Sequence, residues 1–408
     1  MTSKADESLR TIIFLAVASL LIRILLSPMD GYINDLSCFA AWFYTASSGI
    51  SNFYQKVWCD YPPLNVIIFW VFGNLAEKLS LFNTPELVYI LKFPSALFDV
   101  GVAFLIFIIL RRMNSDLSSA ATIYYLFNPA MILNTSIWGQ FDAIYIFFIV
   151  ASLLLLFEEK YEFSAGVFAL AVLTKPQAFA FSPIIIYLLL KKGDLRRILQ
   201  SFLTFTLVCL PFILYFGHEN PLKFLLDVYL GGYGEYPFTS LNAFNVWAFV
   251  GLFEKDTVNV IPHVSYQSVG WMMFALSILI VVIYLDSQYP RLRGSAVSYF
   301  TFIIFLSFFM FLTRMHERYL VPVIALSLIA LPYTRKLLYV YAAFTLTATI
   351  NQAYALNFLN RGVFIPKGDL VSYAVSLINL TVTLYSFYLV MEKELEGEGN
   401  LKEPQRRD

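Results

Sequence analysis

Apolar runs long enough to cross a lipid bilayer dominate this sequence, and they constrain its fold more than any other feature. A helical span needs about 20 residues, and its backbone polar groups must find their hydrogen bonds within the segment. Of the 408 residues, 59% are hydrophobic and 14% are charged, whereas soluble domains carry about 25% charged residues. The chain is therefore predicted to be an all-α polytopic membrane protein.

Twelve apolar runs are predicted to be transmembrane spans. Two of them are short and flank Thr174-Lys175-Pro176-Gln177, which we interpret as a polar kink at a membrane face. The run from Pro62 to Leu79 is instead predicted to lie along the outer face, where its aromatic side chains suit the membrane interface. The twelve predicted spans are 10–26, 87–110, 118–133, 141–157, 163–174, 178–190, 197–216, 266–285, 295–312, 318–332, 336–352 and 370–391.

The distribution of positive charge predicts the topology. With twelve spans, most Lys and Arg residues fall on one side, which is cytoplasmic by the positive-inside rule. Both termini are then cytoplasmic, and residues 392–408 form a charged tail that is predicted to be disordered. The net formal charge is zero, so the sequence has no electrostatic signature of nucleic-acid binding. The predicted outer segments are 27–86, 138–142, 217–265, 313–318 and 361–367; Gly and Tyr residues in 217–265 suggest a mobile lid.

The first outer segment holds the strongest candidate for a catalytic carboxylate. Residues 34–42 predict a short amphipathic helix with Asn34 as its N-cap. Asp35 and Trp42 are seven residues apart, so they share one side of that helix. The run Asp60-Tyr61-Pro62-Pro63 follows, and its prolines allow a new helix to begin. A carboxylate beside aromatic side chains at a membrane surface suits a general base.

A second polar motif, Trp138-Gly139-Gln140-Phe141-Asp142, lies at the outer end of a predicted span. Burial of an amide and a carboxylate at this position is costly, which favours a function for them. The alternative interpretation is that Asp142 only caps the following helix.

A third motif, Arg314-Met315-His316-Glu317-Arg318, concentrates four ionisable side chains between two apolar runs. Arg314 and Arg318 are four residues apart and are expected to share one helical face, with Glu317 adjacent. Guanidinium groups and an imidazole at an outer surface suit a phosphate or diphosphate headgroup. The alternative is an ordinary turn in which Glu317 neutralises its own arginines.

Four further ionisable residues each have two interpretations. Arg361 and Lys367 are placed to reach the same headgroup, or they are ordinary loop charges. Arg23 and Asp99 lie within apolar runs and must face protein or water rather than lipid. In one interpretation Arg23 and Asp99 form a structural pair, and in the other they contact substrate.

Cysteine and histidine patterns give little indication of a disulfide or a metal site. Cys38 and Cys59 both fall in the first outer segment, where they either pair or remain two free thiols. His218 and His263 have no neighbouring carboxylates at a metal-ligand spacing, and Asp35 is not part of an Asp-x-Asp pair. We therefore predict no metal site.

Taken in order, these motifs resemble those of the GT-C superfamily of integral-membrane glycosyltransferases. Four motifs occur in the expected order between residues 30 and 320. They are the aspartate seven residues before a tryptophan, Asp-Tyr-Pro-Pro-Leu, Gly-Gln-Phe-Asp and His-Glu-Arg. The chain is most similar to dolichyl-phosphate-glucose glucosyltransferases of lipid-linked oligosaccharide assembly and to mannosyltransferases of GPI-anchor synthesis. It differs from the eukaryotic members in its shorter C-terminal end and in its Gly-Gln-Phe-Asp turn.

This resemblance implies an inverting transfer of a sugar, mannose or glucose, from a polyprenyl- or dolichyl-phosphate donor. The acceptor would be a lipid-linked glycan, a protein or another glycan on the non-cytoplasmic face, at the cell exterior or in the ER lumen. Asp35 would be the catalytic base, and no metal or other cofactor is expected. The residues implied to bind the donor phosphate are Arg314, His316, Arg318, Arg361 and Lys367, and those implied to bind substrate are Trp42, Asp60, Tyr61, Trp138, Gln140, Asp142 and Glu317.

The same resemblance implies a GT-C-like bundle of about 12 transmembrane helices with interfacial helices in the first outer segment. Residues 1–265 would form the catalytic membrane module, 266–391 the C-terminal membrane helices and 392–408 the cytoplasmic tail. The alternative function is a transporter or flippase for a polyprenyl-linked or amphipathic solute. The charged residues Arg23, Asp99 and Lys175 motivate this alternative. A structural scaffold is a third alternative, but it makes poor use of the outer charges.

Overall fold

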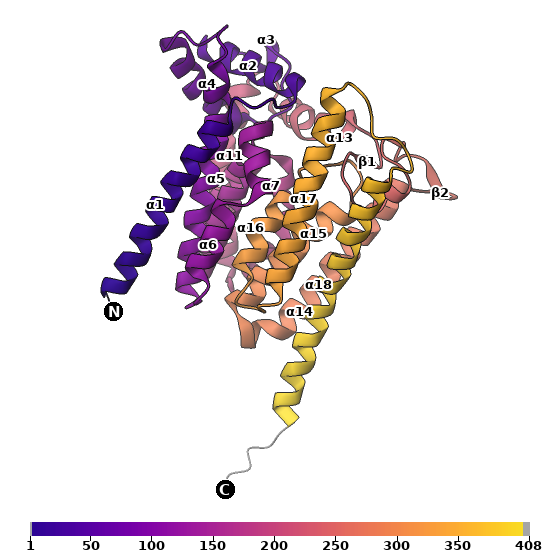
Figure 1. The fold of residues 1–408 in the computed structure, drawn as a ribbon. Coiled ribbons are helices and arrows are strands. Elements are labelled where there is room, and N and C mark those ends of the chain that lie inside the picture. The colour runs from indigo at the N-terminus through magenta and orange to yellow at the C-terminus, as the bar shows by residue number, and fades with distance from the viewer. Residues whose placement is uncertain (1, 403–408) are drawn as a thin grey trace. The chain divides into compact units, whose positions relative to one another are not determined.

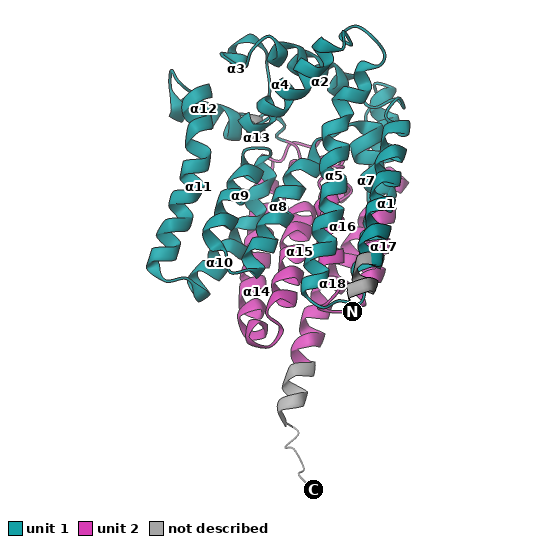
Figure 2. Cartoon of the chain, turned by 90° about the vertical axis from the view of Figure 1, so that its left-hand side faces the viewer, with its two compact units in different colours: residues 1–237, 348–365 teal, residues 238–347, 366–408 magenta. Residues whose placement is uncertain are grey.

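The chain forms two compact units in the computed structural model, which describes residues 2–402. The first unit comprises residues 1–237 and 348–365, and the second comprises residues 238–347 and 366–408 (Figure 2). The predicted module boundary at residue 265 lies inside the second unit.

The first unit is helical. Helix α5 packs against α1, α6 and α8, and α9 packs against both α8 and α11. The C-terminal part of α17 (Leu337–Asn360) also belongs to this unit. The other elements of the unit are α1 (Thr2–Leu26), α2 (Ile33–Ser47), α3 (Phe53–Lys56), α4 (Pro63–Lys78), α5 (Leu87–Arg112), α6 (Ser118–Leu126), α7 (Pro129–Ile132), η1 (Leu133–Trp138), α8 (Asp142–Phe157), α9 (Tyr161–Val172), η2 (Pro176–Phe181), α10 (Ser182–Lys192), α11 (Leu195–Phe216), α12 (Pro221–Leu226), η3 (Asp227–Gly231) and α13 (Gly232–Glu235).

Helices α2, α3 and α4 lie together at one end of the longer helices of this unit (Figures 1 and 2). Helix α4 has 16 residues, which is shorter than the length of about 20 residues needed to cross a bilayer. Helix α2 begins at Ile33 after Tyr32, with no side-chain cap. The prediction that Asn34 caps this helix is therefore wrong, because Asn34 already lies within its first turn.

A buried ion pair joins α1 to α5 in the first unit. Arg23 Nη2 lies 2.6 Å from Asp99 Oδ2, and both side chains are fully buried. Tyr125 Oη donates to the other oxygen of Asp99 at 2.7 Å, and Arg23 Nη1 donates to Leu126 O at 2.8 Å. The geometry supports the interpretation that Arg23 and Asp99 form a structural pair rather than contact substrate, because their polar atoms have hydrogen-bond partners within the protein.

The second unit contains the remaining long helices and two small strand pairs. Helix α15 packs against α14, α16 and α18. Strands β1 and β4 are parallel, with Leu241 opposite His316, and β2 and β3 are antiparallel. The elements are β1 (Ser240–Leu241), η4 (Val246–Phe249), β2 (Asn259–Ile261), β3 (Val264–Ser265), α14 (Tyr266–Leu292), α15 (Gly294–Phe311), β4 (Met315–His316), α16 (Val321–Ile329), the first part of α17, and α18 (Leu370–Lys402).

Two segments are more ordered than the sequence predicts. Residues 217–265 contain α12, η3, α13 and three short strands rather than one open loop, and the Gly-Tyr stretch is partly helical. The predicted disordered tail is instead helical as far as Lys402, as a continuation of α18. Lys336 Nζ also pairs with Glu392 on that helix at 2.6 Å. Residues 403–408 lie outside the described residues.

Within the described residues, six helices are long and apolar enough to cross a membrane. The predicted span 118–133 is not one helix, because Pro129 lacks an N–H and Asn128 caps a new helix by accepting hydrogen bonds from Ala130 N and Met131 N. The predicted span 318–332 contains only the nine residues of α16. The all-α polytopic class is confirmed, whereas the number of twelve spans stays a prediction. The six helices are 7–26 of α1, α5, α11, α14, α15 and 370–395 of α18.

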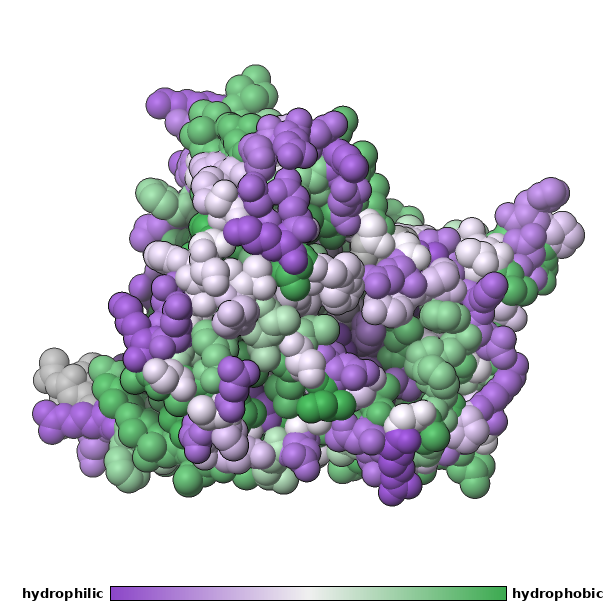
Figure 3. Space-filling view, turned by 90° about the horizontal axis from the view of Figure 1, so that it is seen from above, coloured by the Kyte–Doolittle hydropathy of each residue, from purple (hydrophilic) through white to green (hydrophobic). Residues whose placement is uncertain are grey.

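The exposed surfaces of the long helices suit a lipid environment. Phe14 and Leu25 of α1 and Phe202 and Leu207 of α11 are large apolar side chains that are exposed. Contiguous apolar surface of this kind is typical of contact with lipid or protein rather than water. By contrast, polar side chains are numerous on the face of the molecule that is seen from above in Figure 3.

We expect the substitution Arg23→Met to lower the free energy of unfolding by about 3 to 5 kcal/mol, because it leaves Asp99 buried without its cation. The double variant Arg23→Met, Asp99→Leu should recover part of that loss. Thermal unfolding in detergent micelles measures both. The exposed Arg112, which pairs with Glu158, provides the control, since Arg112→Met should cost less than about 1 kcal/mol. Equal effects of Arg23→Met and Arg112→Met would contradict the prediction.

Candidate functional site

Asp35, in the first turn of α2, receives two hydrogen bonds from the Trp138 to Asp142 motif. Its Oδ2 atom accepts from Trp138 Nε1 at 2.8 Å and from Gln140 Nε2 at 2.6 Å. Hydrogen bonds to an ionised carboxylate are among the stronger ones in proteins. Two motifs that are about 100 residues apart in the sequence therefore meet at one carboxylate.

The turn that carries Gln140 is shaped by Gly139. This glycine has a φ of 86°, a left-handed conformation that residues with a Cβ rarely adopt. The backbone N–H groups of Gly139 and Gln140 both donate to Asn134 O, at 3.1 and 2.9 Å, and so close the end of η1. A Cβ at Gly139 would lie 3.0 Å from Cγ of Lys92. Backbone conformation and limited space both favour glycine here.

Lys92 of α5 fixes the two segments that meet at Asp35. Its Nζ donates to three backbone carbonyls, those of Ser27 at 2.8 Å, Met29 at 2.9 Å and Ile137 at 2.7 Å. Ser27 and Met29 lie in the connection that leads to α2, and Ile137 directly precedes Trp138. The buried ammonium thus uses its three donors to hold this connection against the end of η1.

The connection before α2 and the end of η1 approach each other closely at Gly31. A Cβ at this position would lie 2.7 Å from Trp138 O and 2.9 Å from Ile137 O. Real Cβ atoms do not come so close to backbone oxygens, so any side chain here would push the two segments apart. Gly31 therefore permits the contact that places Asp35 beside Trp138 and Gln140.

Gln140 also presents a buried acceptor beside Asp35. The residue is 1% exposed, and its Nε2 faces the Asp35 carboxylate. No described residue donates a hydrogen bond to its Oε1. Buried acceptors usually have a donor from protein, water or ligand, so this atom is a candidate acceptor for a hydroxyl group of a substrate.

Asp142 belongs to a neighbouring buried network. Lys175 Nζ lies 2.6 Å from its Oδ1, and Asn134 Nδ2 donates to its Oδ2 at 3.1 Å. The ammonium of Lys175 also lies 5.4 Å from the centre of the Tyr61 ring, a cation–π arrangement. The residue that precedes α8 is Phe141 rather than Asp142. The interpretation that Asp142 only caps this helix is therefore wrong.

Trp42 and Tyr61 lie in an aromatic cluster under α2. The Trp42 and Phe69 rings stack with their centres 5.6 Å apart, and Trp42 Nε1 donates to Trp58 O at 2.6 Å. The Tyr61 ring packs 5.2 Å from Trp42. Trp42 is thus buried in this cluster, where it holds the 58–61 segment against α2.

The motif from Arg314 to Arg318 is not helical. Arg314 has a left-handed φ of 62°, and Met315 and His316 form strand β4 beside β1. The guanidinium of Arg314 makes a bidentate pair with the buried Asp256, with Nε 2.7 Å from Oδ2 and Nη2 3.1 Å from Oδ1. The prediction that Arg314 and Arg318 share a helical face is wrong, because strand pairing and this ion pair determine the backbone here.

His316 and Arg318 nevertheless remain close together. Arg318 Nη1 lies 3.5 Å from His316 Nδ1 and 2.6 Å from Glu317 Oε1. The Arg318 guanidinium also lies 5.5 Å from the centre of the Tyr319 ring, and its side chain is 15% exposed. Glu317 therefore partly neutralises this arginine, as the alternative interpretation of the motif expects.

The two remaining candidate cations belong to different units. Arg361 is exposed and follows α17 in the first unit, where Leu356 and Leu359 of α17 pack in one cluster with Trp138. Lys367 is exposed in the second unit and pairs with Glu254 at 2.8 Å. The hydrogen bond to Glu254 raises the pKa of Lys367.

Several residues of the site are not singled out by the sequence motifs. Lys92 is the clearest case. The sequence feature that could have identified it is its position inside the apolar run 87–110, because ionisable residues in such runs are commonly functional or paired. Cys38 and Cys59 are free thiols, the second of the two alternatives. No group of three or more His, Cys, Asp or Glu residues in the described part of the chain is arranged to hold a metal ion.

The comparisons with known proteins identify the family. The family model for glycosyltransferase family 87 matches residues 58–313, a range that includes Trp138, Gln140, Asp142 and Lys175. A search of curated proteins found no match. The resemblance to the GT-C superfamily is confirmed. Because the match covers more than half of the chain, the protein belongs to glycosyltransferase family 87, a family of GT-C-type membrane glycosyltransferases.

Proposed function

We propose that this glycosyltransferase moves a sugar from a polyprenyl-phosphate donor to an acceptor hydroxyl with inversion, and that Asp35 is the general base. The observation that carries the proposal is the geometry of the Asp35 carboxylate. Both of its donors, Trp138 Nε1 and Gln140 Nε2, bind Oδ2, and no described residue donates to Oδ1. One oxygen is thus fixed while the other is available to accept a proton.

In the proposed reaction, the acceptor oxygen attacks the anomeric carbon of the donor sugar while Oδ1 of Asp35 takes the hydroxyl proton. The bond between the anomeric carbon and the phosphate oxygen breaks, and the phosphate leaves with the electron pair. Trp138 and Gln140 hold the carboxylate in one orientation, which is the usual contribution of positioning groups to catalysis. The unpaired Oε1 of Gln140 would accept a second hydroxyl of the acceptor.

The leaving phosphate needs positive charge, and His316 with Arg318 is the proposed source. Charge-assisted hydrogen bonds to the departing oxygens would stabilise the transition state. Arg361 and Lys367 are proposed as further cations for the same headgroup. Because Arg314 is engaged by Asp256, its proposed role is to hold the His316 strand in place.

The donor sugar, acceptor and membrane side follow from the sequence-based predictions. We propose mannose or glucose as the sugar, a lipid-linked glycan as the acceptor, and the cell exterior or ER lumen as the compartment, with both termini in the cytoplasm. The alternative of a transporter has less support. The charges that motivated it are engaged within the protein, as Arg23 with Asp99 and Lys175 with Asp142.

Removal of the proposed base should abolish most turnover. We expect Asp35→Asn to lower kcat by about 10²- to 10⁴-fold, because an amide cannot accept the hydroxyl proton. Release of polyprenyl phosphate from polyprenyl-phosphate mannose or glucose, with lipid-linked glycan acceptors present, measures turnover. Asp30→Asn, which alters an exposed carboxylate five residues earlier, should retain activity. Normal turnover of Asp35→Asn, or loss only in Asp30→Asn, would exclude Asp35 as the base.

The Lys92 contacts predict a positioning effect. We expect Lys92→Met to lower kcat by about 10- to 100-fold with a smaller change in the donor KM, because a small displacement of Asp35 from Gln140 misplaces the base. The matched control is Lys78→Met, which alters an exposed lysine of α4 and should leave kcat unchanged. A change in the donor KM alone would show that Lys92 does not position the base.

Arg318 should act mainly on the donor. We expect Arg318→Gln to raise the donor KM by about tenfold or more, since a charge-assisted contact to the phosphate is lost. Lys336→Gln, at an exposed lysine paired with Glu392, is the control. Thermal unfolding measured in parallel separates a binding defect from a folding defect. An unchanged donor KM in folded Arg318→Gln would contradict this assignment.

A further inference from the structure

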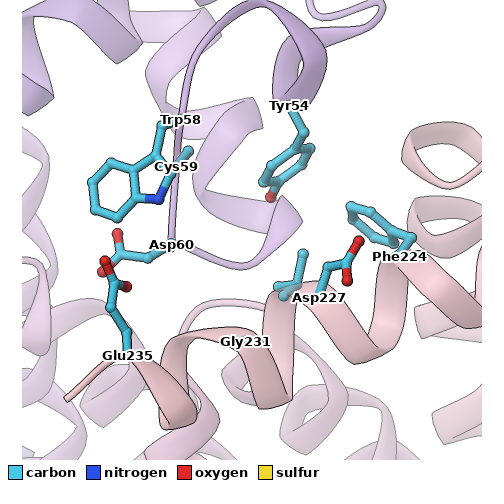
Figure 4. Close-up of a pocket in the computed structure, with 9 residues that line it drawn as sticks. Tyr54, Trp58, Cys59, Asp60, Phe224, Asp227, Gly231 and Glu235 are labelled. Carbon is cyan, nitrogen blue, oxygen red and sulfur yellow. The ribbon is translucent and has the colours of Figure 1, made fainter.

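A cavity of about 450 Å³ in the first unit is lined by both aromatic and acidic side chains (Figure 4). Its volume is within the range of small-molecule sites and is large enough for one or two hexose rings. The segment from Tyr54 to Asp60 forms one wall, and α12, η3 and α13 form the other. The aromatic residues that matter here are Tyr54, Trp58 and Phe224, and the acidic ones are Asp60, Asp227 and Glu235.

The aromatic side chains of the cavity are held in place by contacts within the first unit. Tyr54 Oη donates to Tyr61 O at 2.7 Å, and the Tyr54 and Phe224 rings meet edge to face with their centres 5.2 Å apart. The backbone of Trp58 is fixed by the hydrogen bond from Trp42 to its carbonyl. The Trp58 side chain remains 55% exposed, so a large flat ring faces the cavity without being covered by protein.

The charges of the cavity exclude one class of ligand. None of the residues that line it, all of which are described, is Lys, Arg or His. In Figure 4 the carboxylates of Asp60 and Glu235 point toward the same region beneath the Trp58 ring. A phosphate placed there would meet like charges, which cost several kcal/mol at close range. The donor phosphate therefore does not fit this cavity.

The remaining chemistry favours the hydroxyl groups of a sugar. Carboxylate oxygens accept hydrogen bonds from hydroxyl donors, and flat aromatic rings pack against the C–H faces of sugar rings. The carboxylates do not form a metal-binding group with other described His, Cys, Asp or Glu residues. Together, the aromatic rings and the carboxylates of the cavity suit an uncharged polyol better than a cation or an anion.

The cavity also adjoins α2, the helix that carries Asp35. Trp42 of α2 donates a hydrogen bond to Trp58 O, and Cys38 of α2 packs in one hydrophobic cluster with Tyr54 and Cys59, which line the cavity. Cys38 lies one helical turn after Asp35 on α2, and burial together with the charges of Asp35 and Asp60 raises the pKa of its thiol. Burial and the charge of Asp60, with a smaller effect of Cys38, raise the pKa of Cys59 well above its usual range. Asp60 lines the cavity, and Asp35 lies on the helix that packs against the segment from Tyr54 to Asp60.

We propose that this cavity binds an uncharged sugar of the acceptor next to Asp35, and that Asp227 and Glu235 discriminate against acceptor sugars that themselves carry a phosphate or another anionic group. The role as an acceptor site rests on the proposed function. Trp58 supplies the stacking surface, and the three carboxylates accept hydroxyl hydrogen bonds.

Binding of simple sugars to the full-length protein in lipid nanodiscs tests this proposal. Tryptophan fluorescence is recorded during titration with mannose or glucose, and then with mannose 6-phosphate or glucose 6-phosphate. We expect a saturable change with the uncharged hexoses and affinities at least about tenfold weaker for the phosphates. The change should disappear in Trp58→Phe. The double variant Asp227→Asn, Glu235→Gln should bind hexoses more weakly. The difference in affinity between each hexose and its phosphate should also be smaller in this variant.

The matched control is Glu219→Gln, which alters an acidic residue before α12 that contacts Gln55 rather than the cavity. It should bind like the unaltered protein. Phosphates that bind as tightly as the hexoses would overturn the proposal, as would the absence of any saturable response to hexoses. Because no donor is present, the assay is independent of the transfer reaction. If the unaltered protein transfers sugar but binds no hexose, the cavity proposal is rejected and the proposed function stands. If it binds hexoses but does not transfer sugar from polyprenyl-phosphate donors, the proposed function is rejected.

Discussion

The three hydrogen bonds of the Lys92 ammonium are the interaction on which the candidate site depends. An ammonium buried in a helical bundle is unfavourable unless its donors are satisfied, and here the carbonyls of Ser27, Met29 and Ile137 satisfy them. The same bonds add to the other contacts between these two segments, which are the close approach at Gly31 and the packing of Tyr32 in one cluster with Trp138. The Asp35 carboxylate and its donors Trp138 and Gln140 are arranged as a consequence, because each follows one of the segments that Lys92 holds.

The fold class was predictable because the bilayer restricts which structures are possible. Apolar runs such as those in α5 and α11 imply helices whatever their neighbours are, since backbone groups in lipid must be paired locally. Helix boundaries within those runs were less predictable. The run 118–133 breaks at Pro129, and α18 continues into residues that composition alone assigns to a tail. In both places local hydrogen bonding or tertiary contact decides the outcome, and average hydropathy does not report either.

The candidate site was predictable in part for a related reason. Asp35, Trp138 and Gln140 stand out because polar groups at the ends of apolar runs are costly, and the structure brings all three together. The motif around His316 was identified as a cluster, but its conformation was not, because it depends on a strand partner and on Asp256, about 60 residues earlier. Trp58 and Glu235 carry no sequence signal, since a cavity wall is defined only by packing.

Each unit contains both acidic and basic side chains, but the candidate site residues differ in a way that suits the two halves of the proposed sugar transfer. In the first unit, carboxylates dominate around α2 and the cavity, and the nearby cations Lys92 and Lys175 are engaged by carbonyls and by Asp142. This environment suits an uncharged acceptor that must lose a proton. In the second unit, the His316 strand carries imidazole and guanidinium groups, which suit a departing phosphate. A single mixed site would let each carboxylate neutralise a cation, as Glu317 partly does for Arg318. In the proposed reaction, Asp35 stays available to the acceptor hydroxyl because its described partners, Trp138 and Gln140, are uncharged, while His316 and Arg318 serve the departing phosphate.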